Sequence, residues 1–342
     1  MTDLETLVRA NYGTEEIPAD CREAVLAYLN NFPKKESRRF AFVKGLTKMA
    51  HTLFEQDYQS FSLPALAALI DLHEEGIAMA KEVLDVIIPV EGEELSHAEF
   101  GRRKYFRSSY THLKSHLAAI LIGMDRLNLY PDVNTWRQGM EKAHDLAYSS
   151  GKESWRCEVP VSVYSLHNAG MAAYRLYEET GVLDFVEKSY RTLAGLCIIT
   201  GQDGETKNYL SYNEALQKKA FVAQSTFRDI RKDRGVSPEQ LLLWGGRAYH
   251  STRDRLLEGE LSPVEKANYY FDLGAIVSTI MGVSPDFRLP QRAVWHFQDF
   301  LDYATRNELT GELSHLVSAA QNTLQYIQGD LYENSESNTS PD

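Results

Sequence analysis

The stretch with the clearest capacity for chemistry is a basic and aromatic segment, residues 100–114. Arg103, Arg107, Tyr110 and Lys114 are spaced by four, three and four residues, which would place them on one stripe of a helix. Such a stripe suits an anion, either a phosphate backbone with its bases stacked on aromatic rings or an acidic peptide. The alternative is a solvated helix face whose cations pair with nearby acidic residues.

Two Glu-x-x-His pairs have the spacing that helical carboxylate proteins use to hold two metal ions. Glu94 precedes Ser96, the predicted cap of a helix, so Glu94 would lie outside the helix that carries His97. Glu141 and His144 are three residues apart and fit a solvated pair on one helix face. We therefore predict that neither pair binds a metal.

A third candidate is the pair His112 and His116, because histidines four residues apart on a helix can chelate a metal. No acidic third ligand is near in the sequence, so packing or surface roles are favoured. The chain also has no nucleotide-binding loop, nucleophile elbow or zinc-ligand cysteine pair. We predict no metal, no cofactor and no catalytic residues. A helical enzyme whose groups converge from distant helices remains an alternative.

Composition limits the classes of partner. The chain has 48 acidic and 36 basic residues and a net charge of −12, which argues against undirected affinity for nucleic acid. Its three cysteines form no Cys-x-x-Cys pair, as expected for a reducing compartment. The N-terminus does not resemble a secretory signal, and the densest apolar segment, residues 117–124, is far shorter than the roughly 20 residues of a membrane span. We expect a soluble cytoplasmic protein.

The elements that would position these residues are helices, because almost every segment has helical periodicity and none alternates as a strand would. Predicted helices cover residues 18–31, 35–57, a segment opened by Ser62, and one long helix from about residue 97 to Leu129. Ser237 and Ser262 each begin a capping box followed by a first-turn proline. We predict an all-α chain with an N-terminal helical region 1–92, a repeat region 93–330 and a disordered acidic tail 331–342.

The sequence pattern of a helical hairpin occurs twice, over residues 112–151 and 164–201. In the first helices His116 aligns with His167 at an offset of 51, and in the second helices Gly151 aligns with Gly201 at an offset of 50. Each such unit is too short to bury its apolar face alone, so we predict stacked antiparallel hairpins.

These hairpins resemble the tetratricopeptide family over about half of the chain. The family's first helix carries a large residue, then Leu-Gly, then an aromatic at spacings of three. Two segments fit that spacing, with smaller residues in the second: Tyr270, Leu273, Gly274 and Val277, and Leu166, Ala169, Gly170 and Ala173. In the second helix of the latter hairpin, Val186 and Tyr190 resemble the family's small and aromatic positions. The hairpins here lie about 50 residues apart, whereas the family period is about 34, and the proline expected at Ile198 is missing.

The resemblance implies a concave binding surface made by the first helix of each hairpin. It would place His167, Met171 and Tyr174 on that surface, with His116 and Ile120 from the preceding hairpin. The implied function is a non-enzymatic scaffold or adaptor that binds a protein or peptide, acidic or phosphorylated. The alternative partner is a nucleic acid or other polyanion at residues 100–114. Gly170 should lie where two helices approach closely.

Overall fold

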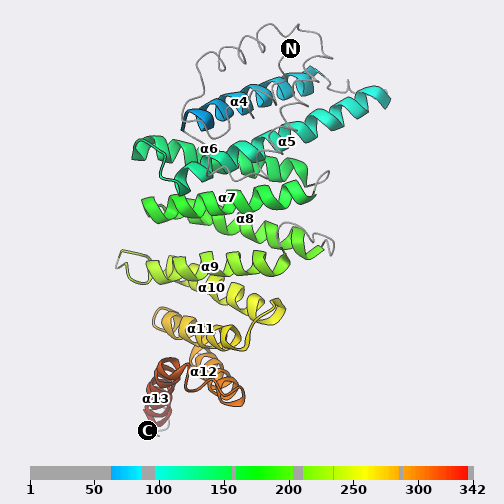
Figure 1. Ribbon diagram of the computed structural model, residues 1–342. Coiled ribbons are helices and arrows are strands. Elements are labelled where there is room, and N and C mark those ends of the chain that lie inside the picture. Colours follow the sequence, from blue (N-terminus) through cyan, green and yellow to red (C-terminus); the bar gives the residue numbers. More distant parts are fainter. Residues whose placement is uncertain are drawn as a thin grey trace. The chain divides into compact units, whose positions relative to one another are not determined.

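The computed structural model describes residues 63–86, 97–155, 159–202, 211–233, 235–284 and 288–337. Within these residues there are ten α-helices and no strand, which confirms the all-α prediction (Figure 1). The helices are α4 (Leu63–Val86), α5 (His97–Arg126), α6 (Val133–Ser154), α7 (Val159–Thr180), α8 (Leu183–Gln202), α9 (Tyr212–Ile230), α10 (Pro238–Glu258), α11 (Pro263–Met281), α12 (Leu289–Arg306) and α13 (Ser314–Ser337). The helices expected at 18–31 and 35–57 lie outside the described residues.

Contacts divide the chain into two compact units, Met1–Leu210 and Ser211–Asp342. The predicted boundary after residue 92 falls inside the first unit, where α4 packs on α5. Helix α13 is described as far as Ser337, inside the segment 331–342 for which the sequence predicts a disordered tail. None of the helices in the described ranges has the length and apolar character that a membrane span requires.

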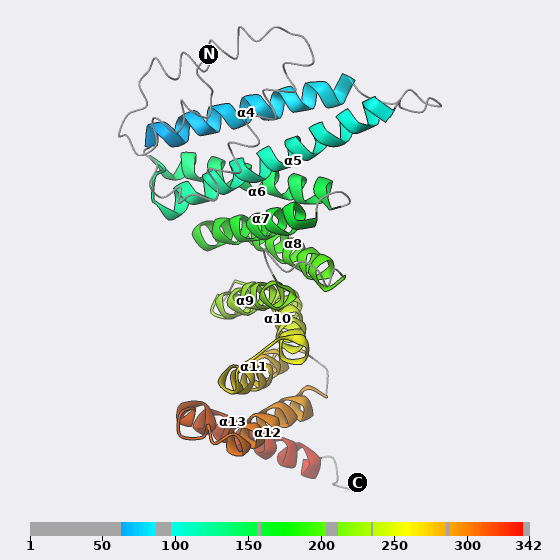
Figure 2. The ribbon, with the colours of Figure 1, turned by 45° about the vertical axis from the view of Figure 1, so that its right-hand side comes forward.

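Two antiparallel hairpins, α5–α6 and α7–α8, stack in the first unit, as the repeat predicts (Figures 1 and 2). Asn128, with a φ of 53°, ends α5, and the Asp132 side chain caps α6 by accepting the backbone N–H groups of Asn134 and Thr135. Gly181, with a φ of 67°, ends α7 and leaves only Val182 before α8. Such short connections force neighbouring helices to run antiparallel.

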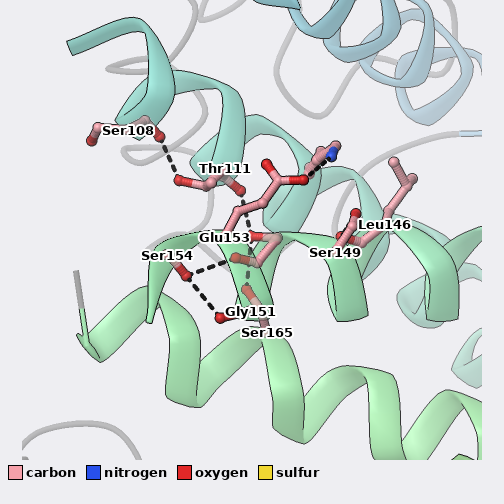
Figure 3. A network of polar contacts seen from close by, with 10 residues as sticks. Ser108, Thr111, Leu146, Ser149, Gly151, Glu153, Ser154 and Ser165 are labelled. Atoms are coloured by element: carbon pink, nitrogen blue, oxygen red, sulfur yellow. Dashed lines mark hydrogen bonds and ion pairs between the residues drawn. The ribbon is translucent and has the colours of Figure 1, made fainter. Parts of the chain in front are cut away.

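Buried hydroxyl groups join three helices of the first unit near the N-terminal end of α7 (Figure 3). The Ser150 hydroxyl of α6 donates to the Thr111 carbonyl of α5 over 2.7 Å and lies 3.1 Å from the Ser165 hydroxyl of α7. Ser165 in turn donates to the Ser115 hydroxyl of α5 over 2.8 Å. Because each hydroxyl has a partner, this polar crossing fits a close-packed interior.

Small residues let the helices of each hairpin touch. A Cβ added to Gly170 of α7 would lie 2.8 Å from the Leu193 side chain of α8, which confirms that this glycine marks a close helix approach. In the second unit, a Cβ on Gly274 of α11 would lie 2.8 Å from the Phe297 ring of α12. The Cys197 thiol of α8 is buried in the α7–α8 hairpin of the first unit.

The second unit contains α9 to α13, and three of its helices begin with a capping box. The boxes at Ser237 and Ser262 confirm the predicted helix starts, and a third lies at Ser211. Polar contacts again join helices one hairpin apart. Gln224 of α9 meets Asp272 of α11, 48 residues away. The first unit has the same arrangement between α5 and α7 at a separation of 50.

Candidate functional site

The five residues predicted to bind a partner divide into buried and partly exposed groups. His116, Ile120 and Tyr174 expose only 7%, 8% and 4% of their surface, whereas His167 and Met171 are partly exposed. This corrects the expectation that all five face one groove. Helix α5 packs against α4, α6 and α7, so the His116 and Ile120 side chains are enclosed.

Two of the five, Met171 and Tyr174, nevertheless line a pocket of about 410 Å³ between α5 and α7. Its apolar lining includes Ile122 of α5, Met140 of α6 and Ala172 of α7. Methionine has several rotatable bonds and a polarisable sulfur, so it adapts to apolar side chains of different shapes. The pocket is large enough for one or two side chains of a partner.

The charged groups at this pocket are paired mainly with one another. The Arg175 guanidinium donates to Asp125 over 3.1 Å and contacts Glu179 at 2.8 Å. Trp136 donates its indole N–H to the other Asp125 oxygen over 2.7 Å. Burial acts to lower the pKa of Arg175, but the neighbouring carboxylates, Asp125 first, outweigh it and the pKa is raised. The Asp125 charge is therefore neutralised within the chain, and Arg126 is a further, exposed cation at the lining.

The predicted anion-binding stripe separates into two parts. Arg107 is exposed and Arg103 is partly exposed. Lys114 is buried, with its Nζ 3.1 Å from the Glu153 carboxylate and 4.0 Å from the centre of the Tyr110 ring. The C-terminal part of α6, which carries Glu153, covers this part of α5, so Lys114 and Tyr110 turn inward. This corrects the expectation of a single exposed stripe.

The candidate metal ligands can be compared with the structure only where it describes them. No cluster of three or more His, Cys, Asp or Glu side chains that could hold an ion occurs among the described residues. His144 is buried against Tyr148, and its Nδ1 lies 2.9 Å from the Asp145 carboxylate, while Glu141 is exposed. This differs from the predicted solvated Glu141–His144 pair. Glu94 lies outside the described residues.

A second pocket, of about 220 Å³, lies between α9 and α11 in the second unit. Asp272 of α11 lies in its wall and accepts a hydrogen bond from the Gln224 amide over 3.2 Å. Burial raises the pKa of Asp272 to about 6, against the opposing effects of Arg228 and Gln224. Arg228 and Arg231, which also line the pocket, are both exposed.

The sequence interpretation missed the residues that give both pockets their charge. Asp125 and Arg175 carry opposite charges at a separation of 50, which is close to the repeat offset. That coincidence was a usable signal. Asp272 stands alone among the apolar residues of the segment 269–277. An isolated acid on a buried helix is a second signal for a site.

Comparisons with known proteins yield only weak matches to solved structures. No protein-family model matches the chain, and no curated protein is similar enough to count as a relative. Among solved structures, a de novo designed helical repeat protein is 13% identical, with a TM-score of 0.30, over 83% of this chain and 100% of that chain. The DHF58 filament is 12% identical, with a TM-score of 0.29, over 82% of this chain and 98% of that chain. A structure from a computational design of self-assembling cyclic homo-oligomers is 11% identical, with a TM-score of 0.19, over 96% of this chain and 93% of that chain. TM-scores this low carry no argument, so the fold assignment rests on the chain's own stacked helices.

Proposed function

We propose that the chain is a non-enzymatic helical-repeat scaffold that holds a peptide segment of a partner protein at the pocket between α5 and α7. The observation that carries this proposal is the pocket of about 410 Å³ whose lining includes Met171 and Tyr174, two of the residues that the tetratricopeptide resemblance implies for a binding surface. Its methionines and aliphatic residues suit an apolar anchor side chain. Arg126, exposed at the same lining, suits an acidic residue beside that anchor.

The experiment uses an array of immobilised peptides that vary one apolar anchor and one neighbouring charge, acidic, phosphorylated or neutral. The full-length chain should bind apolar anchors flanked by an acidic or phosphorylated residue. Met171→Glu should reduce that binding by about tenfold or more, because it places a charge on the apolar wall and repels the acid. Ile198→Glu is the matched control, since Ile198 is an exposed apolar residue of α8 that does not line the pocket.

Arg126→Gln should weaken binding to acidic peptides while leaving neutral peptides unchanged. Arg137→Gln serves as its control, because Arg137 is an exposed cation of α6 that does not line the pocket. If Met171→Glu and Arg126→Gln both bind the same peptides as the original chain, the pocket is not the binding site. A cytoplasmic location belongs to this proposal and remains a prediction.

A second candidate function is polyanion binding at the exposed end of α5. It is favoured by the exposed Phe100 ring and Arg107, with Arg103 partly exposed on the same helix. A single-stranded oligonucleotide should then bind with an affinity that falls steeply as salt is added. Arg103→Glu combined with Arg107→Glu should abolish the binding. Affinity that is independent of salt, or unchanged in the double variant, would remove this candidate.

A further inference from the structure

The pocket between α9 and α11 has the dimensions of a site for a small molecule. Its volume of about 220 Å³ far exceeds the roughly 10–15 Å³ that a cavity needs to hold a single water. It lies below the roughly 300 Å³ at which pockets for drug-sized ligands begin. The occupant that fits is therefore a compact molecule rather than a nucleotide or a folded peptide segment.

Among the described residues, the negative group of this pocket, the Asp272 carboxylate, is bonded to a neutral amide and belongs to no ion pair. Within the described part of the chain, the Gln224 amide is the only hydrogen-bond donor to Asp272, over 3.2 Å. The same Gln224 nitrogen also donates to the Thr252 hydroxyl over 2.8 Å, so both of its hydrogens are used and its orientation is fixed. Oδ1 of Asp272 therefore keeps its capacity to accept a donor from a ligand.

The positive groups lie where the pocket meets solvent. Arg228 and Arg231 of α9 are exposed, while Asp272 is partly buried, so the charge changes from positive at the surface to negative inside. Arg228 donates to the Ser225 hydroxyl of its own helix over 3.2 Å, which leaves other N–H groups of its guanidinium available. Phe227 and Phe271 supply apolar wall between the two charged regions.

We propose that this pocket binds a small zwitterion of the amino acid class. The ammonium group of the ligand donates to Asp272, its carboxylate accepts from Arg228 and Arg231, and its aliphatic part packs between Phe227 and Phe271. A simple anion of the same size would meet the Asp272 carboxylate, and a simple cation would have to pass the two arginines. Only a ligand with both charges satisfies both ends of the pocket.

Calorimetric titration of the full-length chain with small ligands that carry both charges or only one of them tests this assignment. The zwitterionic probes are γ-aminobutyrate and L-leucine, and the singly charged probes are n-butylamine and butyrate. At least one zwitterion should bind, and both singly charged probes should bind at least about tenfold more weakly than it does.

Variants connect the binding to the named groups. Asp272→Asn should weaken zwitterion binding by about tenfold or more, and so should Arg228→Gln combined with Arg231→Gln. The controls are Asp254→Asn and Arg253→Gln, which change one carboxylate and one arginine of α10 outside the pocket. Circular dichroism of each variant establishes that it is folded before binding is compared.

Four results would each overturn the assignment. Butyrate that binds as tightly as the zwitterions would make the pocket an anion site, and n-butylamine that does so would make it a cation site. No binding of either zwitterion to a folded chain at millimolar concentration would leave the pocket without the proposed ligand. Binding that survives in both the Asp272 and the double arginine variants would place the ligand elsewhere.

Discussion

The pocket of the first unit and the pocket of the second each lie between the first helices of two successive hairpins. At the first, Asp125 of α5 meets the Arg175 guanidinium 50 residues later. At the second, Asp272 of α11 meets the Gln224 amide 48 residues earlier. One carboxylate is therefore neutralised by the next repeat, whereas the other retains its charge and has exposed arginines nearby.

The difference shows how a repeated backbone supports two kinds of pocket. Helix stacking brings positions about 50 residues apart into contact in both units, and the side chains at those positions decide what the contact does. An arginine there satisfies the acid and leaves an apolar cavity for a partner's side chain. A glutamine there holds the acid by a neutral hydrogen bond and leaves its charge for a ligand, at a cost in stability because the carboxylate is partly desolvated.

The largest effect should come from placing a large side chain at the close glycine contact between two helices that occurs within each unit. Gly170→Leu and Gly274→Leu should each destabilise the chain by about 3 kcal/mol, since the opposing Leu193 and Phe297 side chains are buried and have little room to move. Thermal unfolding at several pH values measures the loss. Equal, pH-independent losses would support the view that the two hairpins are packed alike, and an unchanged melting temperature in either variant would contradict it for that unit.

Asp272→Asn should raise stability above neutral pH by about 2–3 kcal/mol. In the original chain the folded state holds this proton more tightly than the unfolded state. The stabilisation is therefore complete below the ordinary pKa of 3.8 and is lost as the pH rises through about 6. Asparagine keeps the shape and cannot ionise, so the difference between variant and original should appear across that pH range. A stability difference that is the same at about pH 4 and about pH 8 would refute the buried-charge explanation.

Arg175→Gln should make the first pocket resemble the second, because Asp125 would then face a neutral amide as Asp272 does. We expect the substitution to lower stability by about 1–2 kcal/mol. The variant leaves Asp125 with the Trp136 N–H and a neutral amide in place of a cation. Chemical denaturation at neutral pH measures the loss. Arg191→Gln is the control, because its exposed pair with Glu187 on one helix should contribute no more than about 0.5 kcal/mol. Equal losses in both variants would mean that the Asp125 contact has no special weight.

Ser165→Ala should have the smallest effect, a loss of about 1 kcal/mol that does not vary with pH. It removes the hydroxyl that joins Ser115 to Ser150 across three helices, and serine does not titrate. Ser149→Ala, which removes a hydroxyl bonded to its own helix, should cost less. Urea unfolding at two pH values would detect the difference, and a pH-dependent loss would show that the hydroxyls are coupled to a titrating group.

The features that the sequence predicted well are those determined by neighbours along the chain. The caps at Ser237 and Ser262 need only residues within one helical turn, and the structure places both. The glycine at 170 was also recognisable, because a glycine inside a strong helical pattern requires a packing reason.

The features that the sequence did not predict depend on which surfaces other helices cover. Helical spacing placed Lys114 and Tyr110 on the same stripe as Arg103. Spacing alone does not show that the C-terminal part of α6, with Glu153, covers the part of α5 that carries Lys114. Likewise, the sequence shows Asp272 as an isolated acid, but only the structure places Gln224, 48 residues away, beside it. Contacts between repeats follow from stacking geometry, and a single sequence gives only their approximate separation.

The buried thiol of Cys197 offers a way to measure local opening of the first unit. Cys197 lies on α8, which packs on α7, and a buried thiol reacts with a labelling reagent only when local opening exposes it. In a chain whose Cys21 and Cys157 are replaced by serine, the labelling rate therefore reports how often α8 separates from its hairpin. A peptide that binds and stabilises the first unit would slow that labelling rate. The rate would therefore report the fraction of the chain that is bound, even where binding causes no spectroscopic change.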